Sequence, residues 1–313
     1  MPCQHFVQDP EFWFEDGSII LIACHTGFKV YRRLLMEHSP FFRDLFRIPQ
    51  PAGAPKIDGC PYVVLMDRPE QLKHLLRVIF PTNGNLVFGK PHALVTMDAV
   101  AGTVRLAHKY QMDQLLAQGL SILMDYYTDD FDLWIKPDRP VSMAATDLDA
   151  ISAINIAHLT KTPTILPLAF LHASRVGSAA LRGCIRDRVL TEGLSFEDLE
   201  RVLNGRTIFL KASSKALARI TAPQASDMCA DTRRCTRILA AKACELDVAL
   251  EDMYTSDKVL KWASEYSKPD TSTGMRLCEK CREMIAERET DELKDLWNEL
   301  PDYFDLIVEG WGA

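Results

Sequence analysis

The sequence predicts an α+β protein in which a small sheet capped by helices is followed by an all-α C-terminal region. Two short strand patterns joined by a turn lie near the N-terminus, and a clear helix start follows them at Ser39 and Pro40. From residue 147 onward, apolar residues recur at helical spacing instead. A chain of 313 residues is long enough for two domains of about 150 residues each, so we expect two structural regions.

The first elements form a predicted hairpin. Residues 18–23 are an almost unbroken run of aliphatic and β-branched side chains, which is typical of a buried strand. Residues 24–27 predict a turn that ends at Gly27, because glycine adopts positive φ without steric cost. Residues 28–31 then alternate between apolar and polar side chains, as a half-buried strand does.

A helix is predicted to begin after Ser39. Its hydroxyl is a suitable N-cap, and Pro40 follows at the position where a missing N–H costs nothing. The apolar face of this helix consists of Phe41, Phe42, Leu45 and Phe46. The remaining expectations from the residue pattern in this region are a helical stripe over 72–79, an exposed loop over 81–91, and helical stripes over 100–110 and 115–127 with a break at Met112.

Residues 128–149 contain six acidic residues, two basic residues and two prolines, which mark a domain boundary. We therefore predict domains over 12–128 and 147–313, with a linker over 129–146. The expected helices after the linker lie at 147–159, 166–176, 195–204, 234–266, 275–288 and 291–300. The third of these starts at a capping box around Ser195 and is predicted to stop at Gly205, a natural helix end.

Both halves resemble known proteins. The order of Phe28-x-Val30, Leu34-Leu35 and Ser39-x-x-Phe42-x-x-x-Phe46 resembles the opening of a BTB/POZ domain, in which a histidine usually stands where Tyr31 does. The resemblance implies a further strand over 62–66 and a helix over 69–80, and it covers residues 12–128. In the second half, Ala157-His-Leu-Thr-x-x-Pro163, Leu277-Cys-x-x-Cys281 and Leu296-Trp-x-x-Leu300-Pro-x-x-Phe304 resemble the C-terminal region of the large BTB family of mushroom-forming fungi.

The resemblance implies a non-enzymatic protein–protein interaction module that forms a homodimer and recruits other proteins. Two versions are open: a substrate adaptor for a cullin-type ubiquitin ligase, or a scaffold or transcription-associated partner without ligase contact. The residues implied at the dimer or partner interface are Phe12, Trp13, Phe14, Asp16, Phe28, Tyr31, Arg32, Ser39, Phe42 and Phe46.

Two details of this interface have alternatives. Asp16 and Arg32 form either a buried acid–base pair at the dimer interface or two solvent-exposed charges, since an unpaired buried charge is costly. The adjacent aromatic residues 12–14 precede the first expected strand. They face either a partner or the sheet of their own domain.

Several function classes are disfavoured. The sequence contains no Gly-x-Ser-x-Gly, P-loop, Gly-x-Gly-x-x-Gly or His-Glu-x-x-His motif, so we expect no enzyme and no catalytic residues. A net charge of −7 without a basic patch argues against direct nucleic-acid binding. No apolar stretch approaches the ~20 residues of a membrane span. Nine cysteines without a signal peptide suit an intracellular protein, cytoplasmic or nuclear.

The cysteines allow one metal site. Cys278 and Cys281 have the two-residue spacing that lets both thiolates reach one zinc ion. Cys229 and Cys235, with Cys244 as a substitute, supply two further ligands if the intervening chain folds back. Such a zinc would be structural. The alternative is that Cys278 and Cys281 pack as small apolar side chains. A thiol-based activity is the third option, although acidic and basic neighbours flank the pair equally.

Overall fold

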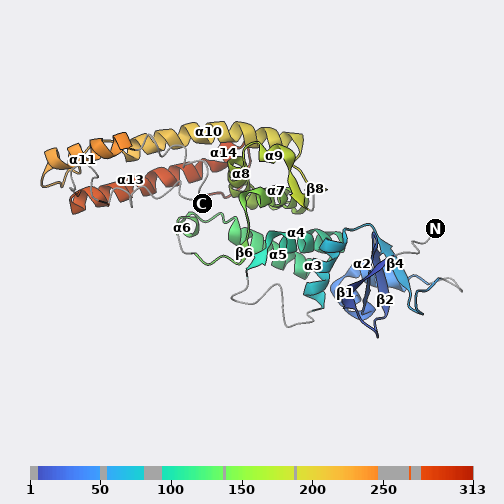
Figure 1. Ribbon diagram of the computed structural model, residues 1–313. Helices are drawn as coiled ribbons and strands as arrows, with labels where there is room; N and C mark the ends of the chain where they lie inside the picture. The colour runs from blue at the N-terminus through green and yellow to red at the C-terminus, as the bar shows by residue number, and fades with distance from the viewer. Residues whose placement is uncertain are drawn as a thin grey trace. The chain divides into compact units, whose positions relative to one another are not determined.

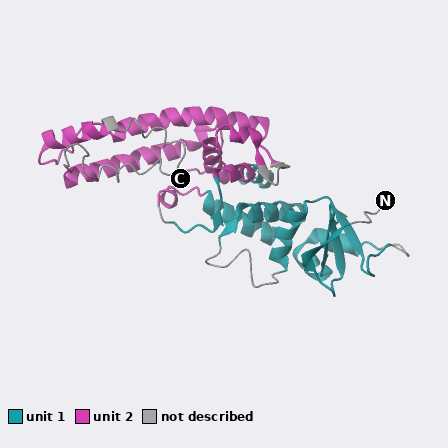
Figure 2. Cartoon of the chain, viewed as in Figure 1, with its two compact units in different colours: residues 1–127, 138–146, 155–162 teal, residues 128–137, 147–154, 163–313 magenta. Residues whose placement is uncertain are grey.

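The computed structural model describes residues 6–49, 55–80, 94–136, 139–186, 189–245, 268 and 276–312. Its internal contacts divide the chain into two compact units (Figure 2). Unit 1 comprises residues 1–127, 138–146 and 155–162, and unit 2 comprises residues 128–137, 147–154 and 163–313. The protein is mixed α+β, with a small mixed sheet in unit 1 and helices in both units (Figure 1).

Unit 1 contains a four-stranded sheet in the order β1-β3-β2-β4. The central pair β2–β3 is antiparallel, whereas β1 runs parallel to β3 and β4 runs parallel to β2. The elements are β1 (Val7–Trp13), β2 (Ile19–Ala23), β3 (Thr26–Val30), α1 (Arg32–His38), α2 (Pro40–Arg47), β4 (Tyr62–Leu65), α3 (Pro69–Ile79), β5 (Val95–Thr96), α4 (Met97–Lys109), α5 (Asp113–Tyr126) and β6 (Met143–Ala144). The predicted loop over 81–91 lies outside the described residues.

The side chains of β2 alternate between two apolar clusters, because successive residues of a strand point to opposite faces. Leu21 belongs to the main core, which also contains Phe28 from β3 and residues from helices α1 to α4. Ile20 and Ile22 belong to a smaller cluster with Cys60. Both faces of the central strand are therefore covered, which explains why its sequence is an apolar run rather than an alternating pattern.

The strand β1 was not predicted. Acidic residues and a proline interrupt its sequence, but ion pairs to α3 hold it in place. Asp9 lies 3.0 Å from the Lys73 ammonium, and Glu11 lies 2.7 Å from the Arg77 guanidinium. Hydrogen bonding from Arg77 holds the pKa of Glu11 below its usual value. The acidic residues that interrupt the strand pattern in the sequence therefore link β1 to α3 through ion pairs.

The turn after β2 differs from the predicted turn in which residue adopts the left-handed conformation. Cys24, not Gly27, adopts the left-handed conformation, with a φ of 49°. Gly27 lies within β3, where a Cβ atom would collide with the rings of Phe6 and Trp13. Close packing of these two rings, rather than a positive φ, therefore requires a glycine at position 27.

Ser39 begins α2 as predicted. Its hydroxyl oxygen accepts a hydrogen bond from the Phe42 backbone N–H at 3.0 Å, and Pro40 occupies the first turn. The same hydroxyl donates to the Tyr110 carbonyl at 2.6 Å, so this fully buried serine joins two distant helices.

We expect Ser39→Ala to destabilise the protein by about 2 kcal/mol, because it removes a helix cap and leaves a buried carbonyl without this donor. Urea unfolding measures the loss. Ser178→Ala is the matched control, since Ser178 is exposed and makes no side-chain cap hydrogen bond. Equal stability of the two variants would contradict this role of Ser39.

Unit 2 is mainly helical, and its long helix α10 packs along α13 and α14 (Figure 1). Its elements are α6 (Phe131–Trp134), α8 (Leu166–Arg175), α9 (Ala179–Arg182), β7 (Cys184–Arg186), β8 (Val189–Glu192), α10 (Phe196–Ile220), α11 (Thr232–Glu245), α13 (Glu279–Asn298) and α14 (Leu300–Tyr303), with short 3-10 turns at Asp147–Asp149 and Pro163–Ile165. The helix α7 (Ala150–Thr160) has residues in both units. No helix within the described ranges is long and apolar enough to cross a membrane.

Three expectations for this region were wrong. It is not all-α, because β7 and β8 form a two-stranded antiparallel sheet. The helix that starts at Ser195 does not stop at Gly205 but continues to Ile220 as α10. The two helices expected over 275–300 are one helix, α13, since no residue between them breaks the backbone hydrogen bonding. Part of the helix expected over 234–266 lies outside the described residues.

Candidate metal centre

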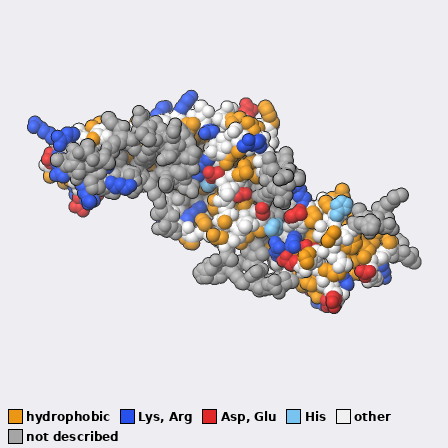
Figure 3. Space-filling view, viewed as in Figure 1, with side chains coloured by type: hydrophobic (Ala, Val, Ile, Leu, Met, Phe, Trp, Pro, Cys, Tyr) orange, Lys and Arg blue, Asp and Glu red, His pale blue; other side chains and the backbone are white. Residues whose placement is uncertain are grey.

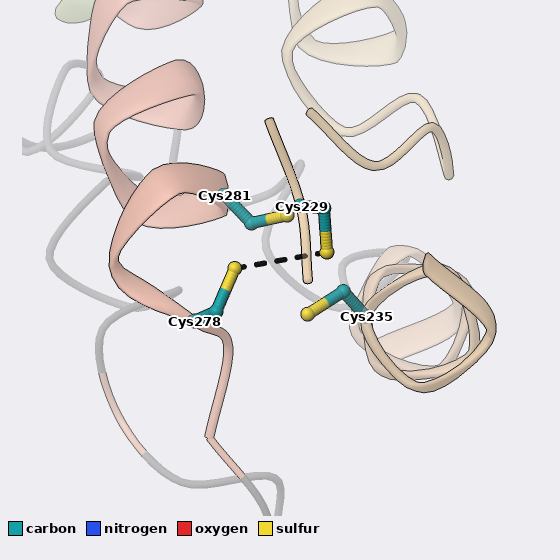
Figure 4. A group of neighbouring side chains, drawn as sticks. All are labelled: Cys229, Cys235, Cys278 and Cys281. Carbon is teal, nitrogen blue, oxygen red and sulfur yellow. Dashed lines mark hydrogen bonds between the residues drawn. The ribbon is translucent and has the colours of Figure 1, made fainter. Parts of the chain in front are cut away.

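Four cysteines from two separate stretches of unit 2 meet at one point (Figure 4). Cys229 lies in the connection between α10 and α11, and Cys235 lies near the start of α11. Cys278 is the N-cap of α13, and Cys281 lies in its first turn. The sequence predicted these four residues as one set, and the structure brings them together.

The spacing of the sulfur atoms fits a single tetrahedral ion. All four Sγ atoms lie within 4.8 Å of one another, and those of Cys229 and Cys278 are 3.7 Å apart. Metal–sulfur bonds of about 2.3 Å in a regular tetrahedron give sulfur–sulfur edges of roughly 3.8 Å. A small contraction of the cluster would therefore bring all four sulfurs into the first coordination sphere of one ion.

Hydrogen bonds of backbone and side-chain groups fix the two halves of the cluster. The Asp231 carboxylate accepts a hydrogen bond from the Arg234 N–H at 3.0 Å and so caps the start of α11, next to Cys235. The Arg234 guanidinium donates to the Arg276 carbonyl at 3.1 Å, which ties this helix start to the segment before α13. The Ser226 N–H points to the Cys281 sulfur at 3.4 Å. These contacts were not predicted: an acidic residue before a helix, such as Asp231, is a usual cap signal, but the Arg276 and Ser226 contacts depend on the tertiary structure.

The cluster has a buried side and a more accessible side. Cys235 and Cys281 are fully buried, whereas Cys229 and Cys278 are half-buried. The surrounding apolar residues are Leu217, Ile220, Ile238, Leu239, Leu277 and Ile285. Cys281 also belongs to an apolar cluster with Ile285, in line with the alternative of apolar packing, but packing alone does not require all four sulfurs to converge.

The four thiols differ in acidity. Burial raises the pKa of Cys235, and it raises that of Cys281 to about 12. Burial acts in the same direction on Cys278, but hydrogen bonds from the Cys281 backbone N–H and from the neighbouring thiols outweigh it and lower its pKa to about 7. Because metals bind thiolates, at least Cys235 and Cys281 must lose protons when an ion binds at neutral pH.

We expect zinc affinity to rise with pH below neutrality by at least about 100-fold per pH unit, because two or more protons are released on binding. Competition with a chromophoric chelator at several pH values measures this slope, after correction for the chelator's own protonation. An affinity that does not change with pH would contradict binding through these thiols.

Exposed basic side chains surround this end of unit 2, where Lys and Arg gather over α11 and α13 (Figure 3). They are Arg233, Arg234, Arg237, Lys280 and Arg282. A divalent ion with four thiolates has a net charge of about −2. Acidic side chains lie at the same end, namely Asp231, Glu279 and Glu283, and Lys280 pairs with Glu283 at 2.7 Å. The basic residues therefore offset the charge of such a cluster only in part.

The predicted interface residues of unit 1 occupy different environments. Phe12 is fully buried in the core. Trp13 packs against Phe6, and Phe14 stacks on Tyr31 with ring centroids 5.1 Å apart. The three aromatic residues thus pack within their own domain, which was the second of the two alternatives, and direct partner contact stays a prediction.

Asp16 and Arg32 do not pair with each other. The exposed Asp16 carboxylate accepts a hydrogen bond from the Tyr31 hydroxyl at 2.8 Å. The Arg32 guanidinium donates to the Phe46 carbonyl and lies 5.2 Å from the centre of the Phe46 ring. Each charge therefore has its own local partner within the chain.

The last group of predicted interface residues lies in the core of unit 1. Phe28, Ser39 and Phe42 have no exposed surface, and Phe46 is partly buried against them. These four residues pack within the domain, and their part in an interface stays a prediction.

Comparison with known proteins adds no family assignment. No family model matches the chain, and none of the curated proteins searched matches it. Among the described residues, the four cysteines are the one group of three or more potential ligands that lie close enough to share an ion.

Proposed function

We propose that this protein is a non-enzymatic, intracellular protein–protein interaction module whose C-terminal helical region is fastened by a structural zinc ion. The observation that supports the zinc most directly is the convergence of the four cysteine sulfurs. Four protein ligands complete a tetrahedral shell and leave no position for a substrate, which is the pattern of structural rather than catalytic zinc. Sulfurs within 4.8 Å leave room for one ion but not for an iron–sulfur cluster.

The interaction half of the proposal rests on the BTB/POZ resemblance of residues 12–128. The order of strands and helices in unit 1 is compatible with it. Apolar side chains also lie at one edge of the sheet: Val64 in the edge strand β4 is 51% exposed, and Met66 just after it is 91% exposed. An exposed apolar edge of this kind is suited to association with a second chain.

We expect the full chain to form a homodimer, since self-association is what the resemblance implies. Light scattering after size exclusion measures the mass directly. A strictly monomeric chain at roughly tens of micromolar, where weak interfaces still form, would contradict this part of the proposal. Met66→Lys should weaken the dimer if β4 contributes to the interface, whereas Met228→Lys, at an exposed position in unit 2, is the matched control.

The proposal has an adaptor version and a scaffold version. Purification of the tagged chain from its native cell extract, followed by mass spectrometry, separates them. Recovery of a cullin together with client proteins supports an adaptor of a cullin-type ubiquitin ligase. Recovery of the chain without a cullin supports a scaffold or transcription-associated partner.

A further inference from the structure

A second site lies in unit 2, at a hollow between the first half of α10 and the segment around α14. It has a volume of about 390 Å³, within the range of roughly 300–1,000 Å³ that is usual for ligand pockets. It is lined by Glu197, Glu200, Arg201, Asn204, Gly205, Ile208, Asp302, Tyr303, Phe304 and Asp305. We call this hollow the α10–α14 pocket.

The charge of the α10–α14 pocket is strongly unbalanced. Four of its lining residues are acidic and exposed, and none of these forms an ion pair within the described part of the chain: Glu197, Glu200, Asp302 and Asp305. The one basic residue, Arg201, is already paired with the buried carboxylate of Asp198 at 3.1 Å. The four carboxylates are therefore left to attract a cation from outside.

The pocket also has an apolar component. Tyr303 and Phe304 are buried and form part of its wall, and the lining residue Ile208 is 47% exposed. Two further apolar side chains stand out on the same helix: Phe196 is 81% exposed and Leu203 is 42% exposed. Exposed apolar side chains next to a hollow are typical of surfaces that bind other proteins.

The combination of negative charge and apolar surface favours a peptide over a simple cation. A peptide brings apolar side chains together with positive charge, whereas a metal cation offers charge alone.

We propose that the α10–α14 pocket binds a basic segment of a partner protein, in which Lys or Arg side chains alternate with apolar ones. The cations pair with the rim carboxylates, and an apolar side chain contacts Ile208 and the aromatic wall. This inference rests on the proposed interaction function and names the surface and the chemistry of the partner. It does not involve the cysteine cluster or the sheet of unit 1.

The test uses the zinc-loaded full chain and a fluorescein-labelled peptide that alternates Arg with Leu. Fluorescence anisotropy gives the affinity. Because any cationic peptide is attracted to a protein of net charge −7, the decisive comparison is between variants of equal charge. Glu197→Gln with Glu200→Gln removes two charges from the pocket. Glu287→Gln with Asp291→Asn removes two from exposed positions of α13 outside it.

We expect the pocket variant to bind the peptide about fivefold to tenfold more weakly than the wild type, and the α13 variant to bind it equally well. Ile208→Ser should also weaken binding, and a peptide alternating Glu with Leu should not bind. The affinity should fall as salt is raised from ~0.05 to ~0.5 M. Equal losses in the two charge variants would overturn the inference, and so would calcium displacing the peptide completely, since the carboxylates would then form a cation site.

This outcome is separate from that of the proposed function. A chain that dimerises and holds zinc but ignores the peptide overturns only the inference. A monomeric chain that binds the peptide through the α10–α14 pocket contradicts only the predicted self-association.

Discussion

Replacement of Cys281 by serine is expected to remove zinc from the protein and to unfold the end of unit 2 where α11 and α13 meet. Cys281 is fully buried, and its sulfur lies within 4.8 Å of the other three. A serine hydroxyl is a poor substitute for a thiolate, so the tetrahedral shell is broken. With free zinc about 1,000-fold above the Kd, loss of the ion removes about 4 kcal/mol of stability.

Elemental analysis gives the zinc content, which we expect to fall from about one ion per chain to near zero. Thermal unfolding followed by circular dichroism gives the stability. Cys60→Ser is the matched control, since Cys60 is a buried thiol outside the cluster. A wild-type chain that contains far less than one zinc would show that the four thiols are only packed together.

Replacement of Gly205 by alanine is expected to destabilise unit 2 by about 2 kcal/mol, because a Cβ atom has no space there. It would lie 2.8 Å from the Tyr303 carbonyl oxygen and would collide with the ring of Phe304. In an open helix the same change is stabilising by up to about 1 kcal/mol. A loss of stability therefore indicates the close contact with Phe304, whereas a gain indicates helix propensity alone.

Urea unfolding of the two proteins measures this difference. Gly193→Ala is the matched control, because no atom lies within 4 Å of a Cβ placed at Gly193. An alanine at position 205 that leaves stability unchanged or raises it would contradict the close approach of Phe304 to α10.

The same glycine shows where sequence reasoning fails. A glycine after a helical pattern predicts a helix end, and that prediction was wrong at Gly205. A glycine is needed there because Tyr303 and Phe304, almost one hundred positions later in the chain, leave no space for a Cβ atom. The strand β1 was missed for a similar reason, since the lysine and arginine that neutralise its acidic residues belong to α3. Local signals identified the elements whose stability is local, such as the capped start of α2 at Ser39.

The cysteine cluster was more predictable than its surroundings. The spacing of Cys278 and Cys281 places two thiols at one helix start, and this requirement is visible in the sequence. The convergence of these two thiols with Cys229 and Cys235 requires the chain to fold back between the two pairs. The sequence allows that reversal but does not specify it. The α10–α14 pocket could not be predicted, because its two walls come from segments that only the tertiary structure brings together.

The long helix α10 has a consequence for how the protein is made. Its packing partners α13 and α14 lie far toward the C-terminus, and two of the four cysteines are there as well. Unit 2 therefore cannot close while the ribosome is still translating residues 279–304, although unit 1 is largely complete by then. During that interval the face of α10 that packs on α13 and α14 stays uncovered, although α8 already packs against another part of the helix. A message that ends early releases a chain that lacks these two helices and two of the four clustered cysteines. Such products are natural substrates for chaperones and proteases.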